Sequence, residues 1–174
     1  IEFHGTSIDE LSVADRHDLG IGLIPEDRQR QALMMSSPLW ENRILGHQRS
    51  KPVMRGFVID KKATVDSTRT IMEEFDVRAP GPDTLAAALS GGNQQRVVLA
   101  KWFAINPHLM ILNGPTVGVD VGSKREILEI IRDRAKNGMA FLVVSDDIPE
   151  LIQICHRILV IKNGKISKEF SESE

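Results

Sequence analysis

The sequence predicts an α/β fold with a mostly parallel sheet, and three observations support this prediction. First, the stretches 20–25, 109–112 and 139–145 are apolar almost throughout, a pattern typical of buried parallel strands. Second, helical patterns lie between these stretches, and strands that alternate with helices of such length indicate a layered α/β domain. Third, Asn163-Gly164 between two apolar runs indicates a hairpin, which adds an antiparallel tail.

The first half of the chain contains fewer regular patterns. Ile1 to His4 indicates the end of a strand, and Ser7 to Leu19 indicates a turn followed by a short helix. Ser67 to Phe75 has apolar residues at helical spacing on one face, and a turn cluster follows it. Residues 32–66 show poor periodicity and are interrupted by Pro and Gly. We therefore expect residues 32–88 to form a smaller, mainly helical insert within the domain.

The second half is more regular. Its predicted elements are a helix over Asn93–Ile105, a strand over 109–112, a helix from 123 to about 136, a strand over 139–145, a helix over Ile148–Cys155 and hairpin strands at 158–161 and 165–167. The helix from 123 is predicted to open with a capping box, Ser123 to Glu126, and to end at Asn137-Gly138. Its residues Ile127, Leu128 and Ile131 should face inward.

The composition limits the class of protein. The chain has 174 residues, 41% of them hydrophobic, which suits one soluble domain with a sizeable core. Lys and Arg number 22 and Asp and Glu 24, so the net charge of −2 favours no nucleic-acid partner. The single Cys155 excludes an internal disulfide and indicates a buried, inert thiol. The histidines have no metal-ligand spacing, and no apolar run is long enough to cross a bilayer, so we expect no metal ligands and no membrane span.

The sharpest local motif is "LSGGNQQR", Leu89 to Arg96. Ser90, Gly91 and Gly92 stand at the start of a predicted helix, where unpaired N–H groups and a partial positive charge can bind a phosphate. The glycines allow close approach of the backbone, and Ser90 adds a hydroxyl donor. Taken alone, the three residues are better explained as an N-cap serine followed by two turn glycines, because short motifs match often by chance.

The order of motifs along the chain favours the phosphate reading. "GIGLIPEDR" (20–28), "LSGGNQQRVVLAKW" (89–102), "PTVGVDVGSK" (115–124) and "VVSDDIPEL" followed by "RILVIKNGKI" occur in that order. This series resembles the nucleotide-binding domain of ABC transporters, and nearly the whole chain takes part in the resemblance. More closely, it resembles the second ATPase domain of the tandem ATP-binding subunits of bacterial sugar and nucleoside importers. Residues 1–174 would then be the C-terminal part of one such domain, with a P-loop NTPase-like ABC ATPase core and the helical subdomain at 32–88.

The resemblance implies several roles. Ser90, Gly91 and Gly92, followed by Asn93, would form the signature that contacts the γ-phosphate of ATP bound by the opposite domain of a dimer. Asp120 would be the D-loop aspartate at that dimer interface. Glu26 falls where most ABC domains carry the Q-loop glutamine. The 32–88 insert would dock on the permease.

The departures from the family pattern concern the domain's own nucleotide site. No G-x-x-x-x-G-K-[S/T] motif occurs in the chain, and family order puts it before Ile1, which indicates an N-terminal truncation. Asn113 occupies the position of the aspartate that positions magnesium, and Gly114 that of the glutamate that polarises water. Asp146 occupies the switch-histidine position, although Asp147 could be the matching residue. Each change also has a plain structural reading, Asn113-Gly114 as a turn and Asp146 as an N-cap.

These observations lead to the following expectations. The chain is an energy-coupling piece of an ABC importer for sugars, with a degenerate Walker B strand, no catalytic residue of its own and a signature that acts in trans. ATP and Mg²⁺ belong to the intact dimer, and we expect neither on the isolated chain. The implied partners are another ATPase domain, a transmembrane permease reached through the 32–88 insert, and indirectly an extracellular substrate-binding protein. The implied location is the cytoplasmic face of the bacterial inner membrane, as a peripheral protein.

Three alternatives stay open. Arg55 to Asp60 and Glu74 to Pro80 also resemble the nucleoside-importer branch. The domain could hydrolyse ATP at its own site by positioning the substrate alone. It could also be an ABC-like interaction module outside transport, such as a scaffold or a chromosome-associated ATPase head. The branch residues "PEDR" and "NQQ" and the lack of coiled-coil heptads count against this last alternative.

Overall fold

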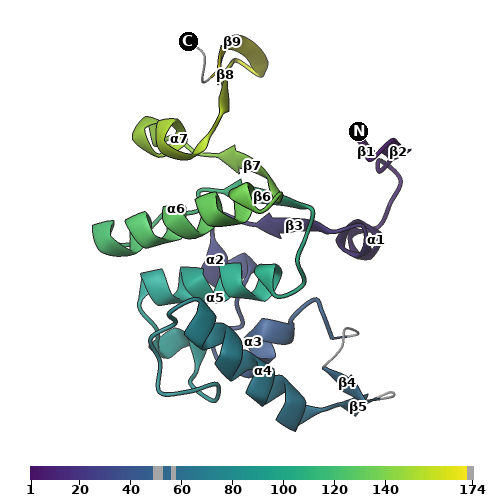
Figure 1. Ribbon diagram of the computed structural model, residues 1–174, viewed down its shortest axis with the longest axis vertical. Coiled ribbons are helices and arrows are strands. Elements are labelled where there is room, and N and C mark those ends of the chain that lie inside the picture. The colour runs from purple at the N-terminus through teal and green to yellow at the C-terminus, as the bar shows by residue number, and fades with distance from the viewer. Residues whose placement is uncertain (49–52, 56–57, 172–174) are drawn as a thin grey trace.

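The fold is described from a computed structural model, which covers residues 1–48, 53–55 and 58–171. Figure 1 shows a central sheet, with the segment 32–88 at one end of the longest axis and a hairpin at the other. The elements are β1 (Glu2–Phe3), β2 (Thr6–Ser7), α1 (Val13–Asp18), β3 (Ile21–Ile24), α2 (Arg28–Gln31), α3 (Leu39–Ile44), β4 (Met54–Arg55), β5 (Val58–Ile59), α4 (Lys61–Glu74), η1 (Ala86–Ala88), α5 (Gly91–Phe103), β6 (Leu109–Asn113), α6 (Val121–Lys136), β7 (Ala140–Val144), α7 (Ile148–Ile154), β8 (Arg157–Lys162) and β9 (Lys165–Ser171).

The central sheet consists of three parallel strands in the order β3-β6-β7. The three apolar stretches of the sequence form these strands, as predicted. Ile24 lies beside Leu112, and Asn113 lies beside Val144, so the carboxyl ends of the strands meet at one edge. Because parallel strands end at the same edge, this edge gathers the loops that follow β3, β6 and β7.

Only one face of this sheet is covered within the described residues, which corrects the prediction of strands buried on both faces. Ile24, Met110 and Leu112 are fully buried on the face covered by α5 and α6. Leu23 and Leu142, on the opposite face, are 49% and 54% exposed. Apolar residues therefore occupy both faces of the strands, but the described residues cover only one of these faces.

Helix α5 connects the sheet with the 32–88 segment. Its side chains Val98, Leu99 and Phe103 share one hydrophobic cluster with strand residues and with residues of α3 and α4. The segment itself contains α3, α4, η1 and the short pair β4–β5, so it is not helical throughout. Residues 49–52 and 56–57, which include part of the stretch similar to nucleoside importers, lie outside the described residues. Whether 32–88 is a separate subdomain stays a prediction.

Two helix starts differ from the prediction. Helix α4 begins at Lys61, six residues before the expected Ser67, with Asp60 as its N-cap. Helix α6 begins at Val121, and its N-cap is Asp120 rather than Ser123. Ser123 donates its backbone N–H to Asp120 Oδ1 at 3.0 Å, so it is the third helical residue and not the cap. Aspartate is as good an N-cap as serine, and here it precedes the predicted box.

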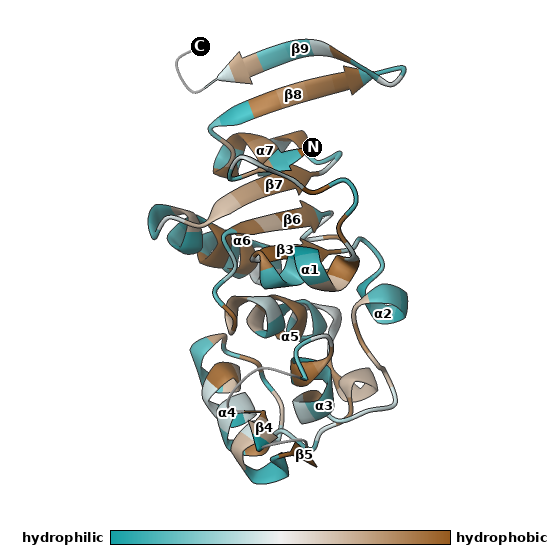
Figure 2. Ribbon diagram, turned by 90° about the vertical axis from the view of Figure 1, so that its right-hand side faces the viewer, coloured by the Kyte–Doolittle hydropathy of each residue, from teal (hydrophilic) through white to brown (hydrophobic). Residues whose placement is uncertain are grey.

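The rest of α6 agrees with the prediction. Ile127, Leu128 and Ile131 are buried, and the helix ends at Asn137 followed by Gly138 at φ +93°. The tail hairpin β8–β9 turns at Asn163 and Gly164, which both have positive φ as the type I′ turn requires. Figure 2 shows this hairpin and α7 at the end of the molecule away from α3 and α4. Among the described helices, none combines the length and the apolar character that a membrane span needs.

Candidate functional site

The predicted signature begins α5. Ser90 is its N-cap and is exposed, and Ser90 Oγ accepts hydrogen bonds from the backbone N–H (3.4 Å) and the amide Nδ2 (3.0 Å) of Asn93. The Oδ1 atom of Asn93 in turn accepts from the backbone N–H of Arg78 at 2.8 Å. The serine hydroxyl is therefore fixed at the surface, at the positive end of a helix of thirteen residues. Such a group can donate to an anion from outside.

The two glycines after Ser90 are required by close contacts. A β-carbon on Gly91 would lie 2.6 Å from the carbonyl oxygen of Gly118, and one on Gly92 would lie 2.3 Å from Ser123 Oγ. The start of α5 thus packs against the loop before α6 and against the first turn of α6. The signature and the stretch 118–123, which are 27 or more positions apart at these contacts, are thereby brought together.

Asp120 lies in this contact region as the exposed N-cap of α6. Its carboxylate accepts from the backbone N–H of Ser123 at 3.0 Å and from the Ser123 hydroxyl at 2.7 Å. These hydrogen bonds lower the pKa of Asp120 below its ordinary value, the backbone bond having the largest effect. Asp120 is therefore a fixed negative charge beside the signature.

The other predicted site residues lie at the carboxyl edge of the sheet. Asn113 ends β6, Glu26 follows β3, and Asp146 follows β7. Glu26 and Asp146 are exposed, and Asn113 is half-buried. A β-carbon on Gly114 would lie 3.5 Å from Glu26 Cγ, so the Glu26 side chain reaches toward the position that carries a glutamate in the family.

Gly114 itself has a backbone that disfavours any side chain. It is buried, its φ is +59°, and a β-carbon there would lie 2.7 Å from Cγ2 of Val117. A left-handed backbone is strained for residues other than glycine. The local backbone at this position therefore favours glycine.

The two candidate switch residues have different surroundings. Asp147 is the N-cap of α7, accepts from the Glu150 backbone N–H at 3.0 Å, and is paired with Lys124. The Lys124 ammonium lowers the pKa of the Asp147 carboxyl and has its own pKa raised by that bond. The interpretation of Asp146 as the N-cap is thus wrong, because Asp147 is the N-cap. Asp146 is exposed, and no hydrogen bond or ion pair to another described residue involves its side chain.

A buried polar network behind Asp147 escaped the sequence reading. Glu150 is 1% exposed and accepts a hydrogen bond from the Thr116 hydroxyl. Lys124 Nζ lies 3.5 Å from the same Glu150 oxygen. The stretch after β6, the first turn of α6 and the start of α7 are therefore tied together through one carboxylate. Thr116, Lys124 and Glu150 are far apart in the sequence, and no local pattern links them.

A second missed residue is Arg28, the last letter of "PEDR". It is 8% exposed and donates to the carbonyl oxygens of Val117 (2.6 Å) and Gly118 (3.2 Å). Burial lowers the pKa of its guanidinium, and Asp27 partly offsets this. The loop after β3 is thereby connected to the loop after β6.

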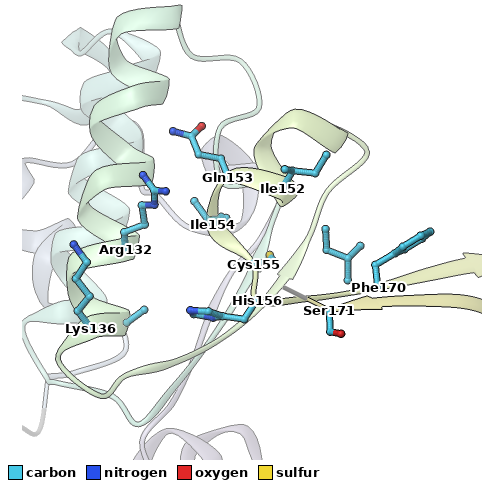
Figure 3. Close-up of a pocket in the computed structure, with 11 residues that line it drawn as sticks. Arg132, Lys136, Ile152, Gln153, Ile154, Cys155, His156, Phe170 and Ser171 are labelled. Atoms are coloured by element: carbon cyan, nitrogen blue, oxygen red, sulfur yellow. The ribbon is translucent and has the colours of Figure 1, made fainter. Parts of the chain in front are cut away.

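One hollow in the described part lies away from these residues. It has a volume of about 780 Å³ and lies between α6, α7 and the β8–β9 hairpin. Figure 3 shows Arg132 and Lys136 on one side and Ile152 and Phe170 on another. None of the predicted site residues lines it. Cys155, at its wall, is half-buried and has its pKa raised mainly by burial, so it is not an activated thiol.

Asn113 and Gly114, at the end of β6, do not fit a Mg²⁺ ligand and a general base. Asn113 offers a neutral amide to a cation that prefers carboxylates, and Gly114 offers none. Among the described residues, no group of three or more His, Cys, Asp or Glu side chains is placed to bind a metal. The Ser90 end of α5, in contrast, has the hydroxyl, the helix N-terminus and the glycines that fit a phosphate.

Solved structures identify the fold as that of ABC ATPases. A dimeric ATP-binding cassette in a post-hydrolysis state, bound to ADP and phosphate, superposes with a TM-score of 0.77 at 20% identity. The match covers 97% of this chain and 71% of that one. A nucleotide-free cassette from an ABC transporter gives a TM-score of 0.79, also at 20% identity, with 97% and 68% coverage. The P-loop NTPase-like α/β class expected from the sequence is confirmed.

The sequence comparisons identify the family: the chain belongs to the ABC transporter family, whose profile matches residues 1–117. The ribose import ATP-binding protein RbsA of Lacticaseibacillus paracasei is 40% identical over 158 residues, covering 88% of this chain and 30% of that protein. The xylose import ATP-binding protein XylG of Burkholderia cenocepacia is 38% identical, covering 98% and 32%. The galactose/methyl galactoside import ATP-binding protein MglA of Clostridium perfringens is 34% identical, covering 96% and 32%. The chain thus spans about a third of the length of these relatives.

Proposed function

We propose that this chain is part of the ATP-binding subunit of an ABC importer for sugars, and that its signature serves ATP held by a partner domain. Its own nucleotide site is degenerate and does not hydrolyse ATP. The similarity to import proteins for ribose, xylose and galactose supports the transport role and the class of substrate.

The observation that carries the proposal is the contrast between the two candidate regions. Gly114, with its positive φ and its close approach to Val117, disfavours the carboxylate that own-site hydrolysis needs. Ser90 and Asp120 are exposed, and each is held by side-chain hydrogen bonds, to Asn93 at 3.0 Å and to Ser123 at 2.7 Å. The Ser90 region thus has the groups that can bind a phosphate, whereas Asn113 and Gly114 lack the carboxylates for hydrolysis. This contrast supports a role in trans.

The proposal places the chain in a larger assembly. The P-loop is proposed to come from a segment before residue 1 of a longer protein, because no such motif occurs in these 174 residues. Within the described part, β7 pairs only with β6 and β8 pairs only with β9, which leaves one edge of each strand for such a segment. Residues 32–88 are proposed to dock on a transmembrane permease at the cytoplasmic face of the inner membrane. An extracellular binding protein would deliver the sugar to that permease.

The test replaces Ser90 by Arg in the intact protein, reconstituted with its permease. A large cation at this N-cap removes the hydroxyl donor and obstructs the phosphate, so ATP hydrolysis should fall about 10²–10³-fold, as for other lost transition-state donors. Ser12→Arg is the matched control, because Ser12 is also an exposed N-cap, on α1. Undiminished transport-coupled hydrolysis in Ser90→Arg would contradict the proposal.

A second candidate, hydrolysis at the domain's own site, is favoured by one observation. Glu26 Cγ lies 3.5 Å from the place of a β-carbon on residue 114, so a carboxylate does reach this edge of the sheet. With the partner site disabled, this candidate predicts measurable turnover that Glu26→Gln lowers about 10²–10⁴-fold, the usual effect of a lost general base. Turnover at background level before the substitution would exclude it. An interaction module outside transport has no such observation in its favour.

A further inference from the structure

The guanidinium of Arg28 occupies a notch between two glycines. A β-carbon on Gly91 would lie 2.8 Å from Arg28 Nη2, and one on Gly118 would lie 3.5 Å from it. Gly118 also has φ +68°, which disfavours other residues. One side chain from the loop after β3 therefore contacts both the start of the signature helix and the loop before α6.

This contact is made by a buried cation that Asp27 influences only at longer range. No ion pair between described residues involves Arg28, and its acceptors are the carbonyl oxygens of Val117 and Gly118. The Nε atom is buried without an acceptor. A buried charge with incomplete hydrogen bonding is an expensive way to fill space. An apolar side chain would fill the notch at lower cost, but it would not fix the two carbonyl groups.

The next residue adds a second connection. Gln29 Nε2 donates to Gln94 Oε1 at 2.9 Å, and Gln94 Nε2 donates to the carbonyl oxygens of Ala86 (3.3 Å) and Leu89 (3.2 Å). Gln94 thus fastens the turn that leads into Ser90. The short helix α2 therefore contacts the start of α5 through two side chains, Arg28 beside Gly91 and Gln29 on Gln94.

We propose that Arg28 is a positioning residue for the surface that acts in trans. Its two hydrogen bonds fix the loop 117–120 against the start of α5, so that Ser90 and Asp120 are presented in one arrangement. Because only residues 25–27 separate Arg28 from the end of β3, this loop at the carboxyl edge of the sheet sets that arrangement. This inference rests on the proposed function only in its last step, the effect on the partner's ATP.

The geometry also predicts which substitutions matter. Only a forked, planar donor can reach both carbonyl oxygens from one position, so Lys can replace one of the two bonds at most. Arg30, on the same short helix, is exposed and makes no side-chain hydrogen bond or ion pair with a described residue. Arg30→Ala is therefore the matched control for Arg28→Ala.

The first measurement does not depend on transport. Amide hydrogen exchange in the intact protein should be about tenfold faster for segments 90–94 and 115–120 in Arg28→Ala. Without the two hydrogen bonds of Arg28, these segments open at a lower cost in free energy. Exchange in the β8–β9 hairpin should not change, and Arg30→Ala should match the unsubstituted protein throughout. Equal exchange of 115–120 in Arg28→Ala and Arg30→Ala would overturn the inference.

The second measurement is ATP hydrolysis with the permease present. Arg28→Ala should lower kcat about 10- to 100-fold, the range for a misplaced catalytic group, with KM for ATP unchanged within about twofold. Arg28→Lys should recover part of kcat. A purely structural role would instead lower the amount of active protein without this recovery. Unchanged kcat in Arg28→Ala, while Ser90→Arg abolishes hydrolysis, would refute the positioning of the trans surface and leave the proposed function intact. If Ser90→Arg has no effect, the proposed function fails and hydrogen exchange alone decides the role of Arg28.

Discussion

A β-carbon on Gly114 would lie 2.7 Å from Cγ2 of Val117, inside the distance that real contacts of this kind tolerate. The two residues form a tight turn directly after β6, closed by a hydrogen bond of 3.1 Å from the Val117 N–H to the Gly114 carbonyl oxygen. Gly114 has φ +59° in this turn. The φ angle and the contact with Val117 each disfavour a larger residue at position 114.

The first prediction concerns stability. Gly114→Ala should lower the free energy of unfolding by about 1–3 kcal/mol, from left-handed strain and the contact with Val117. Chemical denaturation at neutral pH measures it. Gly81→Ala is the control, since a β-carbon there meets nothing within 4 Å. Adding Val117→Ala to Gly114→Ala should recover part of the loss. If both glycine substitutions have equal effects, the constraint at Gly114 does not exist.

The second prediction concerns attempts to repair the site. The pair Asn113→Asp and Gly114→Glu restores the family's residue types, but the glutamate cannot adopt the Gly114 backbone without moving Val117. We therefore expect no recovery of hydrolysis at this site in the intact protein with the partner site disabled. Asn113→Asp alone should fold normally, since Asn113 is a half-buried strand end. Turnover in the double variant comparable to that of the partner site would show that the loop can rearrange.

The strands, α5 and the tail hairpin could be predicted because their apolar periods and turn residues are local signals. The start of α4 could not, because its buried face begins with Thr64 and Thr68, which are 0% and 2% exposed. Their hydroxyls donate to the carbonyl oxygens of Asp60 (2.8 Å) and Thr64 (2.7 Å), so polar residues are buried without an apolar pattern. The apolar helical period of α4 therefore becomes visible in the sequence only at Ile71 and Met72.

The site residues that belong to sequence motifs could be predicted. Those whose role depends on backbone groups far away in the sequence could not. Ser90 as the N-cap of α5 follows from the local pattern, whereas the packing of Gly92 against Ser123 and Asp120 becomes visible only in the structure. Arg28 donates to carbonyl groups 89 and 90 positions away, and no residue type marks a carbonyl acceptor in the sequence. The φ of Gly114 was equally hidden, because an Asn-Gly pair also suits an ordinary turn.

The third prediction separates the two aspartates after β7. Asp147→Ala removes the cap of α7 and the partner of Lys124, so its denaturation midpoint should be lower than that of Asp146→Ala, which removes an exposed side chain. Asp147→Asn keeps a capping side chain without the charge and should fall between them. The lowered pKa of Asp147 adds stability above the ordinary pKa of aspartate, and this part is lost as the pH falls through the lowered value. Equal midpoints for the two alanine variants would contradict the assignment.

The fourth prediction concerns nucleotide binding. The 174 residues alone should show no measurable MgATP binding by calorimetry, because they contain no P-loop and have Asn113 and Gly114 at the magnesium edge. The intact protein with its permease is the positive control. Micromolar affinity of the chain alone would show that Glu26, Asp146 or another group binds nucleotide after all.

The last prediction is an acid-sensitive junction between α5 and the end of α3. His47 is 6% exposed, and its ring lies 5.0 Å from that of Trp102, centroid to centroid. Burial lowers the pKa of His47 from 6.5 to about 4, with further lowering by Lys101, His17 and Arg43. The folded state thus favours the neutral ring. Stability is fully present above pH 6.5 and is lost as the pH falls from 6.5 toward about 4.

Urea denaturation followed by tryptophan fluorescence should therefore show a free energy of unfolding lower by about 1–3 kcal/mol at pH 4.5 than at pH 7, at about 1.4 kcal/mol per pKa unit with partial screening. His47→Gln should remove most of this difference, because a neutral amide gains no proton. His156→Gln is the control, since His156 is exposed. Lys101→Met should also flatten the profile in part, because it removes the cation with the largest electrostatic effect on His47 and lets the ring accept a proton at lower cost. An unchanged profile in His47→Gln would assign the acid sensitivity to other groups.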